Sequence, residues 1–308
     1  VRRIALAPLD ACDRLRGVDR GLPPRWLRSM VGGDFEAVGE EFAWHFRRIA
    51  QLQPFETVLD IGCGSGRMAL PLTAYLQPPG SYDGFDIVPP AVDWCSRHIA
   101  RDHPNFRFQL LDVRNPRYNP GGGAPAVEAR FPYRDAAFDF AFAASVFTHL
   151  AADECRRYVS ETRRVLRPGG RAMLTFFLVD EAAAAEEPGA PAGCLSFERT
   201  APGTFTLHHR PGDVHFAVAY EEGLVRGWLR EAGLAVVDPL GLALGRCDGL
   251  GRGVHGCSRL LRSADPEGCG LRGREIFGAS FHMGRIPVQR LPPAGAAPRA
   301  VARPVRRR

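Results

Sequence analysis

Short apolar runs alternate with segments of helical periodicity along the first 240 residues of the chain. The runs that have the length and apolar character of buried strands are residues 57–61, 82–87, 105–111, 137–144, 171–178 and 234–239. Apolar residues recur at helical spacing in the segments between them, at residues 67–76, 91–100, 153–166 and 221–232. This alternation predicts an α/β fold with a doubly wound, mostly parallel sheet between two layers of helices.

A further amphipathic helix is predicted ahead of the first strand. Asp34 is a residue type that caps helix N-termini, because its carboxylate accepts hydrogen bonds from unpaired backbone N–H groups. Apolar side chains then recur at helical spacing, at Phe35, Val38, Phe42, Phe46 and Ile49. We expect this stripe to pack on the sheet. A helix that covers a bound ligand is the alternative interpretation.

Two segments interrupt the alternation. Residues 114–130 contain two Asn-Pro pairs and a Gly-Gly-Gly run, and we expect them to form a loop. Residues 180–217 form an insertion after the fifth strand. At its end, residues 204–210 and 215–220 are predicted to pair as a short hairpin around a Pro-Gly-Asp turn.

The alternation ends near residue 240. Residues 241–308 scatter Gly, Arg, Cys and Pro, and residues 276–283 are the best candidate for a further strand. This composition is typical of a poorly ordered segment. Two origins of the tail stay open: it is native to the fold, or it is the product of a shifted reading frame. The predicted division is a polar, Arg-rich lead at 1–33, a domain at 34–240 and a tail at 241–308.

Glycines and an acid mark the ends of the first two predicted strands. The first strand runs into Gly62, Gly64 and Gly66, and the second ends at Asp86, twenty residues past the last glycine. Glycines let a backbone turn approach a ligand closely, and a carboxylate at the end of the next strand accepts hydrogen bonds from ribose hydroxyls. The pattern indicates a nucleoside-binding site at the carboxyl edge of the sheet.

The glycine spacing separates two kinds of nucleoside site. Loops that bind dinucleotides follow G-x-G-x-x-G, whereas this chain has G-x-G-x-G and carries Arg67 where the third dinucleotide glycine would stand. A side chain at that position would crowd the close contact between helix and strand that glycine permits. An NAD(P)-dependent oxidoreductase is therefore an alternative and not the first interpretation.

Further motifs accompany the glycine turn in a fixed order. They are VLDIGCGSG at 58–66, FQLLDV at 108–113, FPYRDAAFDFAF at 131–142 and VLRPGG at 165–170. Together they resemble the class I S-adenosylmethionine-dependent methyltransferases, in particular the small-molecule types 11 and 25. The resemblance covers residues 34–240. It implies a Rossmann-like sheet in three layers, a seventh strand that is antiparallel, and a substrate cover built from the insertion.

The resemblance assigns the methionyl end of S-adenosylmethionine to the glycine turn. The backbone of the turn would line this end of the cofactor, at Gly62, Cys63, Gly64 and Gly66. Asp60 would orient the turn and the amino group, and Ala144 and Ser145, just past the fourth strand, would border the same end. Cys63 is expected as a small residue beside the ligand and not as a nucleophile.

The nucleoside end and the acceptor are assigned to other strand ends. By the same resemblance, Asp86 accepts from both ribose hydroxyls, Ile87 lies on the adenine face, and Asp112 and Val113 lie at the adenine edge. His149 follows the fourth strand, where the acceptor approaches the methyl group. An imidazole, with an ordinary pKa of about 6.5, suits a general base. Packing at the start of the next helix is the alternative role for His149.

Composition and charge limit the class of protein further. The chain of 308 residues is 45% hydrophobic and 24% charged, which suits a globular core. Residues 1–240 hold 27 arginines against 30 acidic residues, whereas residues 241–308 hold 13 arginines against 4, and there is no lysine. The positive net charge therefore belongs to the tail. Proteins that modify nucleic acid carry their positive field on the folded body, so nucleic acid is not the expected partner.

The cysteines and the length of the apolar runs point to the cytoplasm. The 8 cysteines include no C-x-x-C pair, which favours free thiols in a reducing compartment over a zinc site or a disulfide framework. No apolar run reaches the roughly 18–20 residues of a membrane span. We expect a soluble, cytoplasmic protein with no metal site.

The expected function is methyl transfer from S-adenosylmethionine to a small-molecule or saccharide acceptor by in-line displacement. Enzymes that methylate the amino group of a base would carry an Asn/Asp-Pro-Pro-Tyr/Phe motif after the fourth strand. In this chain, residues 145–148 read SVFT there instead. A non-catalytic member that binds the cofactor or a partner is a second alternative, beside the oxidoreductase. The sequence leaves the acceptor atom and the oligomeric state open.

Overall fold

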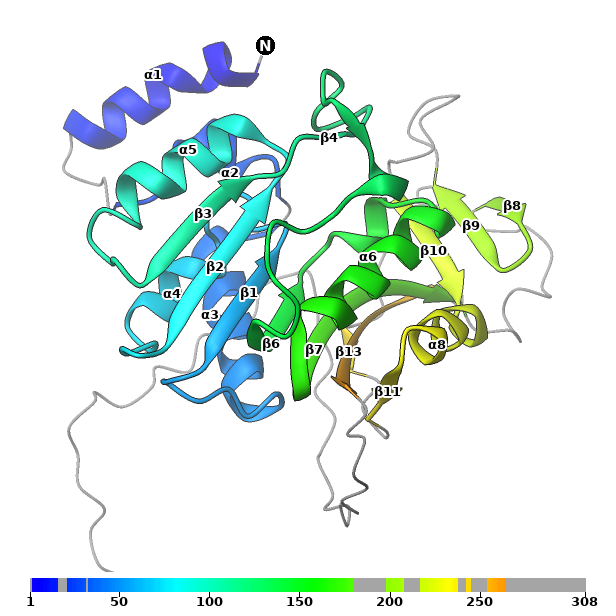
Figure 1. Cartoon of the computed structure of the whole chain (residues 1–308). Helices are drawn as coiled ribbons and strands as arrows, with labels where there is room; N and C mark the ends of the chain where they lie inside the picture. Colours follow the sequence, from blue (N-terminus) through cyan, green and yellow to red (C-terminus); the bar gives the residue numbers. More distant parts are fainter. Residues whose placement is uncertain are drawn as a thin grey trace, which may run out of the picture.

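The computed structural model describes residues 2–15, 21–31, 33–179, 198–207, 217–237, 242–244 and 254–263. A twisted sheet runs through the middle of the described chain, and helices lie against both of its faces (Figure 1). The α/β class and the doubly wound arrangement predicted from the alternation are confirmed.

Five parallel strands form the centre of the sheet. They are β1 (Thr57–Ile61), β2 (Ser81–Asp86), β3 (Phe106–Leu110), β6 (Phe138–Ala143) and β7 (Leu166–Val179). Their order is β3-β2-β1-β6-β7. The direction in which strands are added reverses between β1 and β6, and such a switch leaves a crevice at the carboxyl ends of these two strands, where folds of this kind bind ligands.

Two apolar clusters join the sheet to its helix layers. On one face, α3 (Phe35–Arg48), α4 (Ala69–Thr73) and α5 (Pro89–His98) share a cluster with the strands. On the other face, α6 (Ala152–Val165) and α8 (Glu222–Glu231) do the same. The clusters account for the three layers that the sequence predicts.

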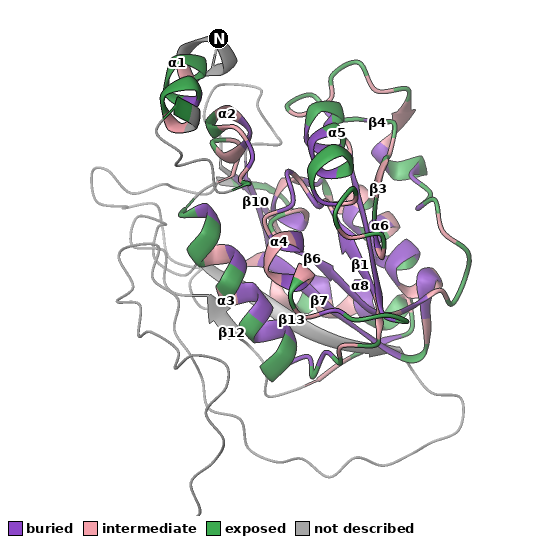
Figure 2. Ribbon diagram, turned by 90° about the vertical axis from the view of Figure 1, so that its left-hand side faces the viewer, coloured by how far each residue is buried: buried purple, intermediate pink, exposed green. Residues whose placement is uncertain are grey.

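The helix ahead of the first strand packs through its predicted stripe. The Asp34 carboxylate accepts from the N–H of Ala37 at 2.8 Å, which confirms the cap. Phe46 is fully buried, and its ring lies 5.4 Å from that of Phe140 and 4.3 Å from that of Phe142, both on β6. Figure 2 shows buried and exposed strips running along α3. The expectation that this helix lies on the sheet is confirmed.

β7 and α4 depart by several residues from the predicted extents. β7 begins at Leu166 and not at residue 171, because Leu166 already pairs with Phe138 before an irregularity in the ladder. α4 covers only Ala69–Thr73 of the predicted 67–76, since the chain leaves the glycine turn through non-helical turns.

The outer edge of β7 carries an antiparallel strand that the apolar pattern did not predict. β13 (Val254–Ser263) pairs with β7 from Val179 to Arg171, and β11 (Leu234–Val236) and β12 (Leu242–Leu244) pair with β13. The sequence VHGCSRLLRS lacks the continuous apolar run of a buried strand. The candidate at 276–283 lies outside the described residues. The sheet thus continues past residue 240, and the domain boundaries remain predictions.

The insertion after β7 returns to the sheet as the predicted hairpin. β9 (Thr204–Leu207) and β10 (Ala217–Glu221) pair antiparallel, and β8 (Glu198–Ala201) pairs with β9. β10 also runs parallel to β7 at residues 177–179. The pairing of β6 with β7 ends at Leu174, and β13 occupies the other edge of β7. The hairpin therefore pairs with the part of β7 that extends past the carboxyl end of β6.

The predicted loop at 114–130 contains short elements. A ladder of two residues on each side joins β4 (Val113–Arg114) to β5 (Ala124–Pro125), and a 3-10 turn, η1 (Ala126–Glu128), follows. The prediction of a loop without regular structure is therefore wrong in part: the backbone of the glycine-rich stretch is held by this small ladder.

Two helices precede α3, within the segment predicted only as a polar, Arg-rich lead. They are α1 (Arg2–Leu15) and α2 (Arg25–Arg28). The guanidinium of Arg25 donates to both carboxylate oxygens of Asp13, at 2.7 and 2.9 Å, and its backbone N–H donates to Asp10 at 2.8 Å. These polar contacts fix α2 to α1.

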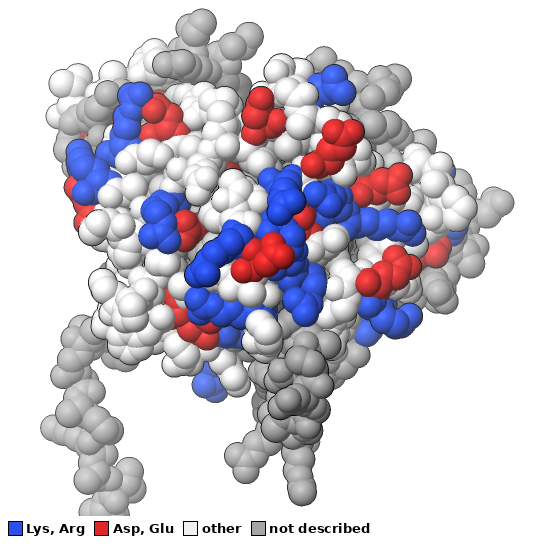
Figure 3. Space-filling model, in the orientation of Figure 1, with Lys and Arg blue, Asp and Glu red and all other residues white. Residues whose placement is uncertain are grey.

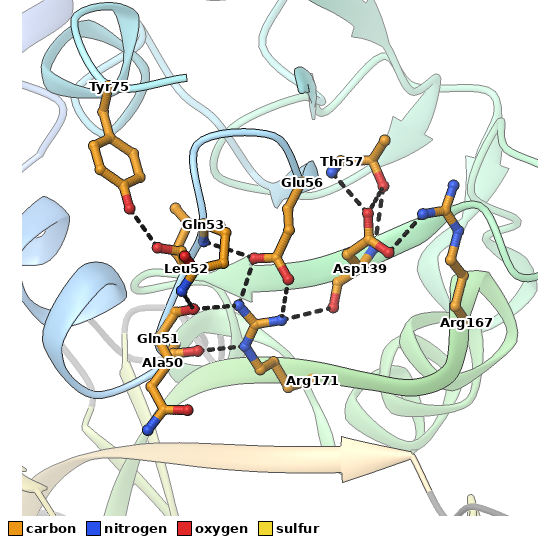
Figure 4. A network of polar contacts seen from close by, with 10 residues as sticks. All are labelled: Ala50, Gln51, Leu52, Gln53, Glu56, Thr57, Tyr75, Asp139, Arg167 and Arg171. Atoms are coloured by element: carbon orange, nitrogen blue, oxygen red, sulfur yellow. Dashed lines mark hydrogen bonds and ion pairs between the residues drawn. The ribbon is translucent and has the colours of Figure 1, made fainter. Parts of the chain in front are cut away.

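Arg171 ties β7 to the segment between α3 and β1 (Figure 4). Its guanidinium forms two bonds with the Glu56 carboxylate, at 2.8 and 2.6 Å, and donates to the carbonyl oxygens of Ala50 and Gln51. Only 10% of the Arg171 side chain is exposed. Water therefore competes little for these groups, and the contact connects two segments that lie far apart in the sequence.

Replacing Arg171 by Met should lower the free energy of unfolding by about 3–5 kcal/mol, because the partly buried Glu56 carboxylate and two carbonyl groups lose a buried partner. Arg167 provides a matched control on the same strand, since it pairs with Asp139 while 39% of its side chain is exposed. Arg167→Met should cost about 1 kcal/mol or less. Urea unfolding measures both variants, and equal losses would contradict the role given to Arg171.

Candidate functional site

A cavity of about 460 Å³ opens at the carboxyl ends of β1, β2 and β6. It occupies the switch between β1 and β6, where sheets of this kind bind ligands. The turn after β1, the end of β2, the segment after β6, the loop at 115–118, α2 and the hairpin all contribute to its wall. The lining residues that the sequence predicted are Gly62, Gly64, Asp86, Ile87, Ala144, Ser145 and His149.

The turn after β1 needs glycine for two different reasons. Gly62, Gly64 and Gly66 have positive φ angles of 80°, 52° and 82°. A Cβ atom on Gly62 would lie 2.5 Å from the Val146 side chain, and one on Gly66 would lie 2.6 Å from Ile99, which follows α5 directly, so neither position has room for a side chain. Gly64 faces open space instead. Its backbone is therefore accessible to a ligand in the cavity.

Asp86 is bonded to the middle of this turn. Its carboxylate accepts from the N–H of Gly64 at 2.7 Å and from the N–H of Val88 at 2.9 Å. Only 9% of the residue is exposed. Burial raises the pKa of Asp86, and the bonds from Gly64 and Val88 oppose that rise. The acid and the glycine turn thus form one unit at the cavity wall.

Asp60 lies inside the sheet and not in the cavity wall. It is 1% exposed, and its carboxylate accepts a hydrogen bond from the Tyr82 hydroxyl on β2. Burial raises the pKa of Asp60 to about 8, although the bond from Tyr82 opposes the shift. Asp60 is not among the lining residues. Its contact with the amino group of a ligand stays a prediction.

Cys63 is buried behind the turn. Its thiol and that of Cys95 on α5 both contact the carbonyl oxygen of Gly64, at 3.7 and 3.6 Å. Contact with Cys95, together with burial, raises the pKa of Cys63 well above its ordinary value. A thiol that stays protonated is a poor nucleophile, which agrees with the expectation that Cys63 serves as a small residue.

The segment after β6 enters the cavity through a strained residue. Ser145 has a φ of 62°, in the left-handed region that few residues other than glycine adopt. Its N–H donates to the Thr175 hydroxyl on β7 at 2.7 Å, and its own hydroxyl lies 3.4 Å from that of Thr148. Strain of this kind clusters at functional sites, and both Ala144 and Ser145 line the cavity.

His149 faces the cavity together with the loop at 115–118. Its ring packs edge-on against Tyr118, with 5.6 Å between the ring centroids. Asn115 fixes the loop, because its side-chain oxygen accepts from the N–H groups of Arg117 and Tyr118 at 3.0 and 3.1 Å. An imidazole, a phenol and a guanidinium therefore belong to one part of the wall.

Asp112 and Val113, predicted at the adenine edge, do not line the cavity. Asp112 is exposed and accepts from the N–H of Gly123 at 3.1 Å, whereas Val113 is buried in the apolar core. The start of α5 supplies the wall next to Ile87 instead, through Val88 and Ala91.

Several lining residues were missed in the sequence. They include Leu27, Met30 and Val31 in and after α2, and Arg67, Phe177 and Ala217. The first three stand at positions i, i+3 and i+4, which is helical spacing, so a closer reading of the Arg-rich lead would have found them. Phe177 and Ala217 carry no such signal, because they reach the cavity only through the pairing of β10 with β7.

The fold and the site together define a class of protein. A switch-point crevice, a turn of glycines and an acid that ends the next strand make a domain that binds a nucleoside at the carboxyl edge of its sheet. The usual dinucleotide-binding sheet is built from two βαβαβ halves with the strand order 3-2-1-4-5-6. Here β13 is antiparallel and stands between β7 and β11, as the resemblance to the methyltransferases predicts.

Comparison with known families identifies the domain. Residues 58–170 match the family model of a methyltransferase domain. These residues are a class I S-adenosylmethionine-dependent methyltransferase domain, and the resemblance drawn from the motifs is confirmed. Within the described stretches of the chain, no helix has the length and apolar character that crossing a membrane requires.

Individual relatives are distant and partial. The chain is 33% identical to the ribosomal protein L11 methyltransferase of Thermus thermophilus, over 51% of this chain and 52% of that protein. It is 30% identical to nocamycin O-methyltransferase of Saccharothrix syringae, over 47% of this chain and 48% of that protein. The chain thus spans about half the length of these curated relatives.

A solved structure shares the fold. It comes from Galdieria sulphuraria and is provisionally described as a sarcosine dimethylglycine methyltransferase. The match has a TM-score of 0.50 at 17% identity and covers 74% of this chain and 86% of that one. This likeness extends the agreement in fold beyond the residues that the family model matches.

The raised pKa of Asp60 predicts a pH dependence of stability. The carboxyl has a pKa of about 8 in the folded protein against an ordinary value of 3.8, so the folded state binds the proton more tightly. Stability therefore falls as the pH rises between these values, by up to about 1.4 kcal/mol for each pH unit. Asp60→Asn keeps an acceptor for Tyr82 and removes the titrating group.

Urea unfolding near pH 5.5 and near pH 7.5 tests this expectation. The loss of stability on raising the pH should be smaller in Asp60→Asn than in the wild type. Burial also raises the pKa of Glu41, to about 6, but this contribution is common to both proteins and cancels in the difference. An identical pH dependence in the two would show that Asp60 is not protonated in the folded protein.

Proposed function

We propose that the protein transfers a methyl group from S-adenosylmethionine to a small-molecule acceptor. The observation that carries the proposal is the unit of Asp86 and Gly64 at the switch-point cavity. A carboxylate that accepts hydrogen bonds stands there beside a backbone turn with open space in front of it.

The residues at the cavity fit this cofactor chemically. The two ribose hydroxyls are donors, and Asp86 offers them carboxylate oxygens. Ile87, Val88 and Ala91 supply an apolar wall for the base. The turn at residues 62–66 and the segment 144–145 would bind the methionyl part of the cofactor, as the resemblance implies. Asp112 and Val113 lie outside the cavity wall, and their place at the adenine edge stays a prediction.

When bound, the cofactor supplies a methyl group activated on a sulfonium. The residues of the chain then have to bind, align and exclude water, and holding two reactants in attack geometry contributes about 7–11 kcal/mol. Apolar side chains from α2, with Phe177 and Ala217, line further parts of the wall. They suit the exclusion of water and the enclosure of a compact acceptor.

The size of the cavity favours a small acceptor. Its volume of about 460 Å³ lies within the range of roughly 300–1,000 Å³ of small-molecule sites. Nocamycin O-methyltransferase is named for transfer to an oxygen, whereas the L11 relative is named for a ribosomal protein. The similarity to these relatives therefore does not determine the acceptor. The proposal of a small acceptor rests on the size of the cavity, and a saccharide is one member of the small-molecule class.

The surface charge gives no continuous track for nucleic acid on the face shown in Figure 3, where arginines are interleaved with acidic side chains. Ion pairs on the described chain include Arg107 with Asp83 and Arg164 with Asp135, at 2.5 and 2.8 Å. A nucleic-acid site depends on basic groups that are available to phosphates. This distribution supports a small-molecule acceptor.

Within this proposal, His149 accepts a proton from a hydroxyl or amine acceptor. It lines the cavity in the segment after β6, a few residues past Ser145, whereas the nucleoside residues come from the end of β2. The ring is oriented by its edge-on contact with Tyr118. A positioned base of this kind contributes about 10²–10⁴ in rate.

Asp86→Asn should weaken the binding of S-adenosylhomocysteine by about tenfold or more, because hydrogen bonds to a charged group are stronger than those to an amide. Isothermal titration calorimetry on the full chain measures the affinity. Asp83→Asn is the matched control, since Asp83 lies on the same strand outside the cavity wall and pairs with Arg107. It should bind like the wild type.

The same titration separates the alternatives. Binding of NAD by the wild type, with no heat from S-adenosylhomocysteine, would replace the proposal by the oxidoreductase. Binding of S-adenosylhomocysteine without methyl transfer to any component of a cell extract would favour the non-catalytic alternative.

His149→Gln should lower kcat by about 10²–10⁴ while the dissociation constant of S-adenosylhomocysteine stays within about twofold of the wild-type value. Glutamine can hydrogen-bond but does not accept a proton near neutral pH. The assay follows labelled methyl from S-adenosylmethionine into a panel of phenols, amines and sugars. His103→Gln, outside the cavity wall, is the control. An unchanged kcat would leave His149 with a packing role only.

A further inference from the structure

A short segment carries His149 from β6 to α6, and hydroxyl groups of neighbouring strands hold both of its ends. At its start, the N–H of Ser145 donates to the Thr175 hydroxyl on β7 at 2.7 Å. At its end, the Leu150 carbonyl accepts a hydrogen bond from the hydroxyl of Tyr220 on β10. His149 lies one residue before this second contact and lines the cavity. The place of its imidazole therefore depends on how both ends of the segment are fixed.

The contact between Tyr220 and Leu150 is withdrawn from water. Tyr220 is fully buried, and Leu150 is 5% exposed. The thiol of Cys155, on the first turn of α6, lies 3.6 Å from the Tyr220 hydroxyl and 3.8 Å from the Leu150 carbonyl oxygen. Burial raises the pKa of Tyr220, so its hydroxyl keeps the proton that it donates. A buried carbonyl that loses its donor is costly, and this bond therefore holds the end of the segment.

Tyr220 comes from the insertion hairpin, which also contributes to the wall of the cavity. Ala217, three residues earlier on β10, lines the cavity, as does Phe177 on the part of β7 that pairs with β10. Side chains alternate along a strand, and Val218 and Tyr220 point instead into the apolar cluster shared by α6 and α8. One strand thus borders the cavity through one face and holds the segment of His149 through the other.

Both the Tyr220 ring and the backbone that it holds have defined positions. The ring packs edge-on against Trp228 on α8, with 5.0 Å between the centroids, which sets the direction of the hydroxyl. Between the two attachments the backbone forms a 3-10 turn, η2 (Phe147–His149), and the N–H of His149 donates to the Val146 carbonyl at 2.9 Å. A segment that is short, internally bonded and fixed at both ends presents the imidazole in one direction.

We infer that Tyr220 is a positioning residue for His149: its hydroxyl holds the Leu150 carbonyl and thereby keeps the imidazole in place for the acceptor. The inference rests on the proposed function and adds to it a residue of the insertion, to which no motif assigns a role. A displacement of about 1 Å at a reacting group can cost roughly 100-fold in rate. A bond that touches neither substrate can therefore determine turnover.

Tyr220→Phe keeps the ring and removes the hydroxyl. It should lower kcat about 5–100-fold, while the dissociation constant of S-adenosylhomocysteine stays within about twofold of the wild-type value. An unchanged kcat would overturn the inference. Tyr133→Phe is the matched control, because it removes a buried phenol hydroxyl that has no hydrogen-bond partner in the described part of the chain and that lies outside the cavity wall. It should keep the wild-type kcat.

A double-mutant cycle separates positioning from a general loss of structure. In the His149→Gln background the group to be positioned is absent, so Tyr220→Phe should change the remaining kcat by less than about twofold. The assay of labelled methyl transfer measures the wild type, both single variants and the double variant. Losses that multiply in the double variant would overturn the inference. A Tyr220→Phe chain that does not fold would also overturn it, since the bond would then have a structural role only.

A spectroscopic measurement tests the same point without an acceptor. In protein that carries isotopically labelled histidine, the nuclear magnetic resonance signal of the His149 ring is the one missing from His149→Gln. This signal should shift in Tyr220→Phe and stay unchanged in Tyr133→Phe, and a signal unmoved by Tyr220→Phe would overturn the inference. Failure of the proposed function is distinguishable, because the wild type would then transfer no methyl group while the shift of the His149 signal would persist.

Discussion

The hydrogen bond from the N–H of Gly64 to the Asp86 carboxylate joins the two halves of the nucleoside site. One half is the turn after β1 and the other is the end of β2, and the ladder that pairs Ile61 with Phe85 brings both strands to an end at the same edge. The backbone continues this pairing past β1, since the N–H groups of Gly62 and Cys63 both donate to the Phe85 carbonyl, each at 2.9 Å. A slip of one residue would turn Asp86 to the opposite face, so the site depends on the register.

This constraint also determines the shape of the turn. The glycine positions meet three other parts of the fold: Gly62 meets Val146 after β6, Gly66 meets α5, and the middle glycine faces the cavity. A side chain at either outer position would push these elements apart, whereas the middle position has room in front of it. The ligand surface is therefore backbone that is packed on one side only.

Much of this half of the molecule could be predicted from the sequence, because local patterns specify it. β1 runs over the predicted residues 57–61, and Asp34 caps α3 as expected. The burial of Asp60 has a simple physical origin: side chains alternate along a strand, and Leu59 and Ile61 face one helix layer, so Asp60 turns to the other and pairs with Tyr82. β13 escaped prediction because its backbone pairing with β7 leaves no periodic trace in its side chains.

The remaining wall of the cavity has a different physical basis, and this bears on how an acceptor is chosen. It comes from α2, from the loop at 115–118 and from β10. Polar contacts position these segments: Arg25 binds Asp13, the Asn115 side chain binds its own loop, and β10 forms three ladder pairs with β7. Leu27, Tyr118 and Val218 also pack into the apolar clusters of the sheet, but none of these segments takes part in the pairing of β1 with β2 that forms the donor side. Substitutions in these segments can therefore reshape the acceptor side while the donor side keeps its register. A rigid strand edge that presents variable segments is the usual way in which one scaffold serves several substrates.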